Sequence, residues 1–261
     1  MNQDRVKELL LSVRDAPLDF SVVFTGKQSK KVNGLYKPDT REILLHNKNF
    51  SDDNLLMYTA FHEYAHHLHA CERGGKLGAR AHTAEFWSIL HGLLREAEDA
   101  GAYRNVFADS PELEELTESI RKKYLYENGS LVKDLGKQLL KAHELCDAIG
   151  ARFEDYVDRV LRIPRLSAKI AMKMYQYNLN PSMGADNMKI VAGIRDEEKR
   201  MAAESSLISG KSPDEVKSTL SKQPSEPDSK DRLEKEKIRL ERTIENLHKR
   251  LDEVERELQD L

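Results

Sequence analysis

The chain has 261 residues, of which 33% are charged, and a formal net charge of −3. This length suits one or two domains plus an extension, and the small net charge excludes an overall basic field, so binding of nucleic acid would need a local basic patch. No segment approaches the ~20 apolar residues that span a bilayer, and Met1 to Arg14 lacks the features of a signal peptide, so we expect a soluble, cytoplasmic protein without a membrane partner.

The N-terminal part begins with the pattern of a short helix followed by a strand-rich piece. Apolar and β-branched residues predict strands over 18–24 and 42–46. Between these strands lie the turn residues Gly34, Pro38 and Asp39, which indicate a meander or a hairpin.

Two longer helices are predicted next. The first should run over 54–71, because residues 51–53 offer N-caps and the two glycines at 74–75 lie just past its end. The second should run over 83–100, with Gly101 after it.

The first of these helices carries the sequence His62-Glu63-Tyr64-Ala65-His66. A spacing of four residues places His62 and His66 one turn apart on the same helix face, where two neutral imidazoles can bind one zinc ion. Glu63 can point toward a zinc-activated water and act as the general base. Six of the nine histidines lie between His62 and His91, a clustering that core packing does not easily explain.

A catalytic zinc ion needs a third protein ligand and an open fourth position. His69 lies two turns from His62 and cannot share its ion, given a rise of ~1.5 Å per residue, and His67 points elsewhere. The third ligand must therefore come from another element, where the candidates are His82, Glu85 and His91. We favour His82, at the start of the second helix, and Glu85 is the alternative.

Residues 106–220 have an almost entirely helical pattern. The periodic segments predict helices over 131–149, 153–161, 166–179 and 186–206. Ser212-Pro213-Asp214-Glu215 is typical of a further helix start. The buried faces should contain Cys146 and four methionines, Met172, Met174, Met183 and Met188.

Five basic residues and no acidic ones occur between Arg159 and Lys173, on both sides of Pro164. Two short helices with a tight turn could form a helix-turn-helix that binds DNA. The preferred interpretation is an ordinary helical hairpin with a solvated basic face.

The C-terminal segment has a seven-residue apolar repeat. Residues 221–230 are polar and contain proline, as in a linker. Over 231–261, apolar residues recur every seven positions at Leu233, Leu240, Leu247, Val254 and Leu261, and the alternate positions are Lys237, Ile244, Leu251 and Leu258. This pattern predicts a coiled coil that is too short to be stable without a partner helix. The sequence does not decide between self-association and docking onto another protein.

Residues of about 18–100 resemble the compact zinc peptidase domains of the SprT, YgjP and WLM type, a minigluzincin-like group. These domains have a third histidine that opens the next helix in a pattern like His-Gly-Pro-Glu-Phe-Trp, and this chain reads His82-Thr83-Ala84-Glu85-Phe86-Trp87. The stretch from Gly34 to Leu45 is similar to the strand–turn–strand that precedes the active helix of the group. The zinc ribbon common in the SprT type is absent, because Cys71 and Cys146 cannot form one.

The resemblance implies a zincin-like fold, zinc ligation by His62, His66 and His82, and Glu63 as the base. Glu85 would then be a helix residue rather than a ligand. It also implies that the second strand of the Gly34–Leu45 unit is the edge on which an extended peptide would lie. The two cysteines form no C-x-x-C pair, so a disulfide scaffold is not expected and a reducing compartment fits.

We therefore expect an α+β chain with a zincin-like metallopeptidase domain over 1–105, a helical domain over 106–220, a linker over 221–230 and a coiled coil over 231–261. The expected function is that of a hydrolase, a zinc metalloprotease that cuts a protein or peptide substrate. Two alternatives are a DNA-associated regulatory or repair protein and an inactive zinc-binding scaffold. An intact Glu63 argues against the scaffold, because a purely structural zinc site has no use for a general base.

Overall fold

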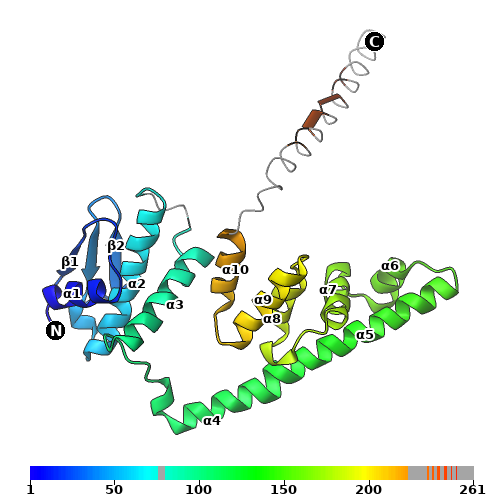
Figure 1. Cartoon of the computed structure of the whole chain (residues 1–261), viewed down its shortest axis with the longest axis horizontal. Coiled ribbons are helices and arrows are strands. Elements are labelled where there is room, and N and C mark those ends of the chain that lie inside the picture. The colour runs from blue at the N-terminus through cyan, green and yellow to red at the C-terminus, as the bar shows by residue number, and fades with distance from the viewer. Residues whose placement is uncertain are drawn as a thin grey trace. The chain divides into compact units, whose positions relative to one another are not determined.

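A computed structural model describes residues 1–75 and 80–222, together with eight single positions between 234 and 251. The chain is α+β, mostly helical with one small three-stranded sheet (Figure 1). Contacts divide it into two units, Met1–Leu220 and Ser221–Leu261. Within the described residues, no helix has the length and apolar character that a bilayer span requires.

The sheet has the strand order β1-β3-β2. β2 (Gly34–Lys37) pairs antiparallel with β3 (Glu42–Leu45), so the expected hairpin is present. β1 (Ser21–Phe24) pairs parallel with β3, so a simple meander through the strands near 18–24 and 42–46 is wrong. The reason is that β2 lies between these two strands in the sequence and reverses the chain before β3 begins.

The expected edge strand is also corrected. The second strand of the hairpin, β3, lies in the centre of the sheet, because Ile43 and Leu45 are fully buried and β1 covers its other side. β2 is the edge strand that faces the histidine-bearing helix α2 (Asp53–Glu72). On the side of the sheet next to α2, an added peptide strand would therefore pair with β2.

Three helices complete the N-terminal core. α1 (Gln3–Val13), α2 and α3 (Ala84–Asp99) pack with the sheet around fully buried Phe61, Tyr64 and Phe86. α2 starts at the Asp52 cap, whose side chain accepts the Leu55 N–H. Along its C-terminal half α2 is buried almost all round, which explains why an amphipathic pattern is weak in this helix.

The second half of Met1–Leu220 is helical. After η2 (Phe107–Asp109), α4 (Pro111–Ile120), the π-helical η3 (Arg121–Tyr126) and α5 (Glu127–Ala148) follow without a break (Figure 1). The elements that follow are α6 (Phe153–Asp155), π-helical η4 (Tyr156–Leu161), α7 (Arg165–Gln176), η5 (Pro181–Met183), α8 (Ala185–Ala192), α9 (Glu197–Ile208) and α10 (Pro213–Lys222).

Two of the predicted helices differ clearly from the observed ones. The helix predicted over 131–149 begins earlier, because α5 continues directly from η3. The helix predicted over 186–206 is two helices, because the chain leaves the helical path after Gly193 and Asp196 caps α9 by accepting the Lys199 N–H. The break at Pro164 is present. Cys146, Met174, Met183 and Met188 are buried, and Met172 is partly buried against the cluster that contains Cys146.

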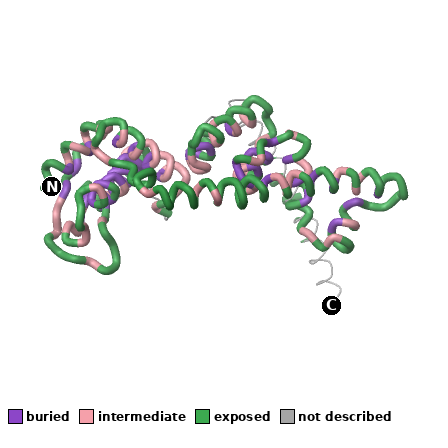
Figure 2. Tube along the Cα trace, turned by 90° about the horizontal axis from the view of Figure 1, so that it is seen from below, coloured by how far each residue is buried: buried purple, intermediate pink, exposed green. Residues whose placement is uncertain are grey.

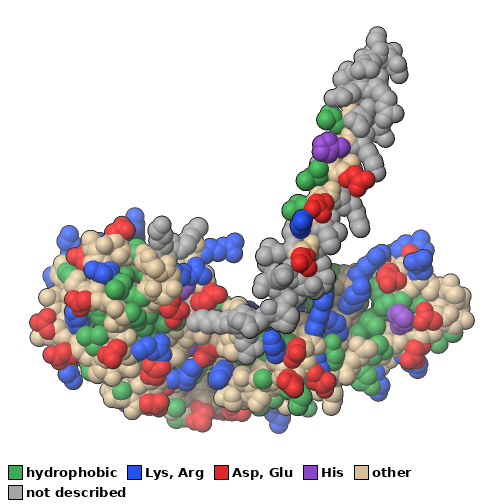
Figure 3. All heavy atoms as spheres, turned by 45° about the horizontal axis from the view of Figure 1, so that its top comes forward, with side chains coloured by type: hydrophobic (Ala, Val, Ile, Leu, Met, Phe, Trp, Pro, Cys, Tyr) green, Lys and Arg blue, Asp and Glu red, His purple; other side chains and the backbone are tan. Residues whose placement is uncertain are grey.

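Two of the basic residues around Pro164 form ion pairs with acidic residues of the same chain. Arg159 forms an ion pair with Asp155 at 2.9 Å, and Arg165 forms one with Asp158. On the face that Figure 3 shows, acidic and basic side chains are interspersed. This region therefore does not present five free cations on one face.

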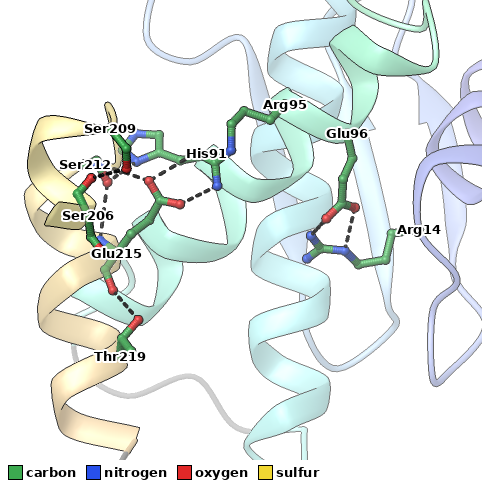
Figure 4. Close-up of polar contacts among 9 residues, drawn as sticks. All are labelled: Arg14, His91, Arg95, Glu96, Ser206, Ser209, Ser212, Glu215 and Thr219. Carbon is green, nitrogen blue, oxygen red and sulfur yellow. Dashed lines mark hydrogen bonds and ion pairs between the residues drawn. The ribbon is translucent and has the colours of Figure 1, made fainter. Parts of the chain in front are cut away.

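Helix α10 is tied to α3 by polar contacts (Figure 4). Arg95 donates to both carboxylate oxygens of Glu215, and His91 Nδ1 lies 2.8 Å from the Ser212 hydroxyl. Ser212 and Glu215 also cap α10 reciprocally, since each backbone N–H donates to the other side chain. The helix start predicted at Ser212 is confirmed.

An Arg95→Ala variant should lower the free energy of unfolding by about 1 kcal/mol in urea titrations at pH 7, because Glu215 is buried and keeps its charge without its main partner. Burial raises the pKa of Glu215, but hydrogen bonds from Arg95 and Ser212 hold it below its ordinary value. The stabilisation by the Arg95–Glu215 ion pair should therefore be present at neutral pH. It should disappear as the pH falls through the range in which carboxyl groups are protonated. Arg121→Ala is the matched control, because its pair with Glu118 is exposed on both sides; equal effects of the two variants would contradict the prediction.

The predicted coiled coil falls mainly on residues that the structure does not describe. Of 231–261, the eight described positions are all helical, and Lys237 pairs with Glu241 one turn away at 3.7 Å. The predicted linker over 221–230 also lies outside the described residues, except for Ser221 and Lys222, which continue α10.

Candidate metal centre

Three histidine side chains meet between α2 and the start of α3. His62 and His66 lie one turn apart on α2, and His82 lies just before Thr83, which caps α3. His82 Nε2 is 3.1 Å from His62 Nε2 and 3.2 Å from His66 Nε2. All three ligand atoms lie within 4.8 Å of one another, so these residues could hold one metal ion.

The separations of the three nitrogens are compatible with a bound cation. Nitrogens bound to one tetrahedral zinc ion at 2.0–2.1 Å lie roughly 3.3 Å apart, close to the two observed separations. Burial, followed by the neighbouring histidines, lowers the pKa of His62 to about 4 and that of His66 to about 3. These two rings are therefore neutral at pH 7, as metal ligation requires.

Aromatic side chains from α3 pack on the histidines. Phe86 stacks on His66 with ring centroids 4.2 Å apart, and Trp87 stacks on His82 at 5.6 Å. Phe86 is fully buried. These rings fix the orientation of the imidazoles and lower the local dielectric constant around them. This gives a physical role to the Phe-Trp pair that follows His82.

Glu63 lies beside the three histidines, against the edge strand. The residue is 7% exposed, and burial raises its pKa to about 7 although a hydrogen bond with the Tyr36 backbone lowers it. The backbone of Gly34 leaves the space that Glu63 occupies: a Cβ at position 34 would lie 2.9 Å from Glu63 Cγ and 3.0 Å from Oε1. Glu63 is thus held between α2 and β2 with a pKa near neutrality.

A cleft of 470 Å³ opens over these groups. One wall is the segment 32–36, which includes the first three residues of β2, and another is the α2 face with Tyr58 and Thr59. His62, Glu63, His66 and His82 line the same cleft. An extended chain that entered the cleft would meet the β2 edge and the histidine cluster together.

The other candidate residues of the sequence lie elsewhere. Glu85 is near Arg73, at 4.0 Å, and His91 contacts Ser212, so neither belongs to the group of three. His67 has a structural role, because Tyr36 OH lies 3.0 Å from its Nδ1 and its Nε2 lies 2.9 Å from the Leu18 carbonyl oxygen. His69 is also buried and does not belong to the group.

Gly34 and Tyr36 are site residues that the sequence did not reveal. Gly34 reads as a turn residue, yet it begins β2 and touches Glu63. Tyr36 contacts Glu63 through its backbone and His67 through its hydroxyl. The only available signal was their place in the strand–turn–strand before the histidine helix.

Comparison of the chain with protein-family models, with curated proteins and with solved structures found no match in any of the three. The functional argument therefore depends on the geometry of the site and on the chemistry of its side chains.

Proposed function

We propose that the chain is a zinc-dependent metalloendopeptidase in which His62, His66 and His82 bind the metal and Glu63 is the general base. The observation that carries the proposal is the convergence of three imidazole Nε2 atoms beside a buried carboxylate at the edge of a sheet. Zinc bound there would polarise the scissile carbonyl and lower the pKa of a water molecule to about 7.

The residues of the chain supply the remaining chemistry. Glu63 accepts a proton from the attacking water and passes it to the leaving amine, so no net proton is left on the enzyme. A carboxyl pKa near 7 suits both transfers, because neither protonation state is strongly disfavoured. β2 is an edge strand that lines the cleft, so an extended peptide that paired with it would be aligned along the cleft.

The first test uses the purified full chain, elemental analysis and a protein or peptide substrate such as casein. We expect one zinc per chain, cleavage that a chelator removes, and recovery when zinc is returned. A protein that binds no zinc would refute the whole proposal. A protein that holds zinc and cuts none of a diverse peptide library would instead support the scaffold alternative.

A Gly34→Ala variant should lower kcat/KM at least tenfold while leaving the zinc content unchanged. The three atoms nearest to the added methyl group, 2.9 to 3.0 Å away, belong to Glu63 and Thr59 and none of them to the three histidines. The size follows from the usual contribution of a positioned base, about 10²–10⁴-fold. Gly92→Ala is the matched control, because its Cβ would meet only the flexible end of Arg14, at 3.2 Å. Loss of zinc in Gly34→Ala, or full activity, would contradict the proposed position of Glu63.

A further inference from the structure

The wall loop, residues 25–33, joins β1 to β2 and forms part of the wall of the cleft. Its last two residues, Val32 and Asn33, line the cleft directly before β2 begins at Gly34. No residue of the wall loop is buried, so none of them is drawn purple in Figure 2. Polar contacts rather than core packing therefore hold the shape of this part of the cleft.

The start of the wall loop is held by the segment that follows β3. The Asn47 side chain accepts the Gly26 N–H at 3.0 Å. The Thr25 hydroxyl lies 2.8 Å from His46 Nδ1. These contacts fix where the loop leaves the sheet.

Asn49, the last residue of η1 (Asn47–Asn49), holds the middle and the end of the wall loop. Its Oδ1 accepts the Ser29 N–H at 2.8 Å, and its Nδ2 donates to the carbonyl oxygens of Ser29 at 2.8 Å and Val32 at 3.4 Å. Nδ2 also lies 2.8 Å from Asn33 Oδ1. Because a backbone N–H can only donate and a carbonyl oxygen can only accept, these partners fix the orientation of the Asn49 amide.

The end of the wall loop sets the direction of the first backbone groups of β2. His46 N–H donates to the Asn33 carbonyl at 2.9 Å, so this carbonyl faces β3. Thr25 N–H donates to the Leu45 carbonyl at 3.0 Å, so the backbone of Leu45, which lies opposite Gly34, faces β1. Backbone groups alternate along an antiparallel pair, and this alternation directs the N–H and C=O of Gly34 away from β3, toward the edge of the sheet. An extended peptide that paired with β2 would meet Gly34 there.

We propose that Asn49 is a positioning residue for peptide binding, which keeps Val32, Asn33 and the edge at Gly34 in the shape that an extended substrate requires. This inference rests on the proposed function, because it takes the occupant of the cleft to be the peptide substrate. Asn49 is not among the described residues that line the cleft, so it acts through the wall loop. If the loop leaves this shape, the apparent dissociation constant of the peptide rises by the factor by which the competent population falls. The reaction rate of the bound complex stays the same.

The test is an Asn49→Asp substitution in the full-length chain. The carboxylate keeps the acceptor of the Ser29 N–H, but it removes the donor to the Ser29 and Val32 carbonyl oxygens and places an oxygen against them. We expect KM for fluorescein-labelled casein to rise about tenfold, while kcat changes less than about threefold and the zinc content stays the same. A purely structural defect would instead lower kcat in proportion to the folded fraction and leave KM unchanged.

Two further variants separate the loss of the donor from the added charge. Asn47→Asp is the matched control, because it introduces the same charge two residues away and keeps the acceptor of the Gly26 N–H. It should leave KM unchanged. Ser29→Ala adds no charge, but it removes the hydroxyl that accepts the Lys31 and Val32 N–H groups within the wall loop, and it should raise KM about threefold.

Binding without cleavage separates this inference from the proposed function. The same substitutions are placed in a Glu63→Gln chain, and the fluorescence anisotropy of labelled casein gives its dissociation constant. If the wild type cuts nothing but Asn49→Asp still weakens casein binding, the proposed function fails and this inference stands. If casein is cut with the same KM by wild type, Asn49→Asp and Ser29→Ala, this inference fails and the proposed function stands. Equal weakening by Asn49→Asp and Asn47→Asp, or a chain that neither binds nor cuts casein, would also overturn the role of Asn49.

Discussion

A Glu63→Gln variant should bind zinc like the wild type and cut peptide substrates roughly 10²–10⁴-fold more slowly, the usual range for a lost general base. The amide has nearly the size of the carboxylate, so it can occupy the same space beside Gly34. It cannot accept the proton of the attacking water. Glu63 does not belong to the group of three histidines that could hold the metal, so the metal content should not change.

The measurement pairs single-turnover cleavage rates with zinc content determined on the same preparation. Glu85→Gln is the matched control, since it makes the same chemical change on α3, where Glu85 lies near Arg73 and outside the histidine group. The control should keep both zinc and activity. If Glu63→Gln cuts as fast as wild type, Glu63 is not the base and another group must accept the proton of the attacking water.

How much of this site a sequence can predict depends on whether the residues share one element. His62, Glu63 and His66 lie on one helix, so helical geometry alone brings them together. His82 was favoured as third ligand over Glu85 and His91, and the structure places only His82 with the other two histidines. Its role as a zinc ligand stays a prediction. Distances between separate elements, such as that between Gly34 and Glu63, leave no periodic trace in the sequence.

The sheet shows the same limit. Alternating apolar residues predicted strands near 18–24 and 42–46, but a strand pattern does not state its partner. The central position of β3 follows from contacts with β1 and β2 on both sides. Similarly, the predicted helix over 186–206 had a continuous pattern, and the break after Gly193 depends on the local cap at Asp196. Local signals therefore predicted the elements better than they predicted the pairing and the breaks.

A His82→Ala variant should lose its zinc. Two imidazoles from α2 would remain, and since outer-shell partners alone change metal affinity 10–100-fold, loss of a direct ligand should weaken binding by at least ~10². His82 is exposed, so its removal should not open the core. Elemental analysis after dialysis at micromolar protein should give close to one zinc per wild-type chain and almost none for the variant.

Thermal unfolding gives a second readout that does not require activity. A ligand at 1,000 times its dissociation constant stabilises the folded state by about 4.1 kcal/mol, so a chelator should lower the Tm of the wild type and leave that of His82→Ala unchanged. His91→Ala removes an imidazole on α3 that contacts Ser212 rather than the cluster. It should therefore keep its zinc and its response to the chelator. If zinc were instead lost in His91→Ala and kept in His82→Ala, the third ligand would be His91 on α3. His82 would then only pack against His62 and His66.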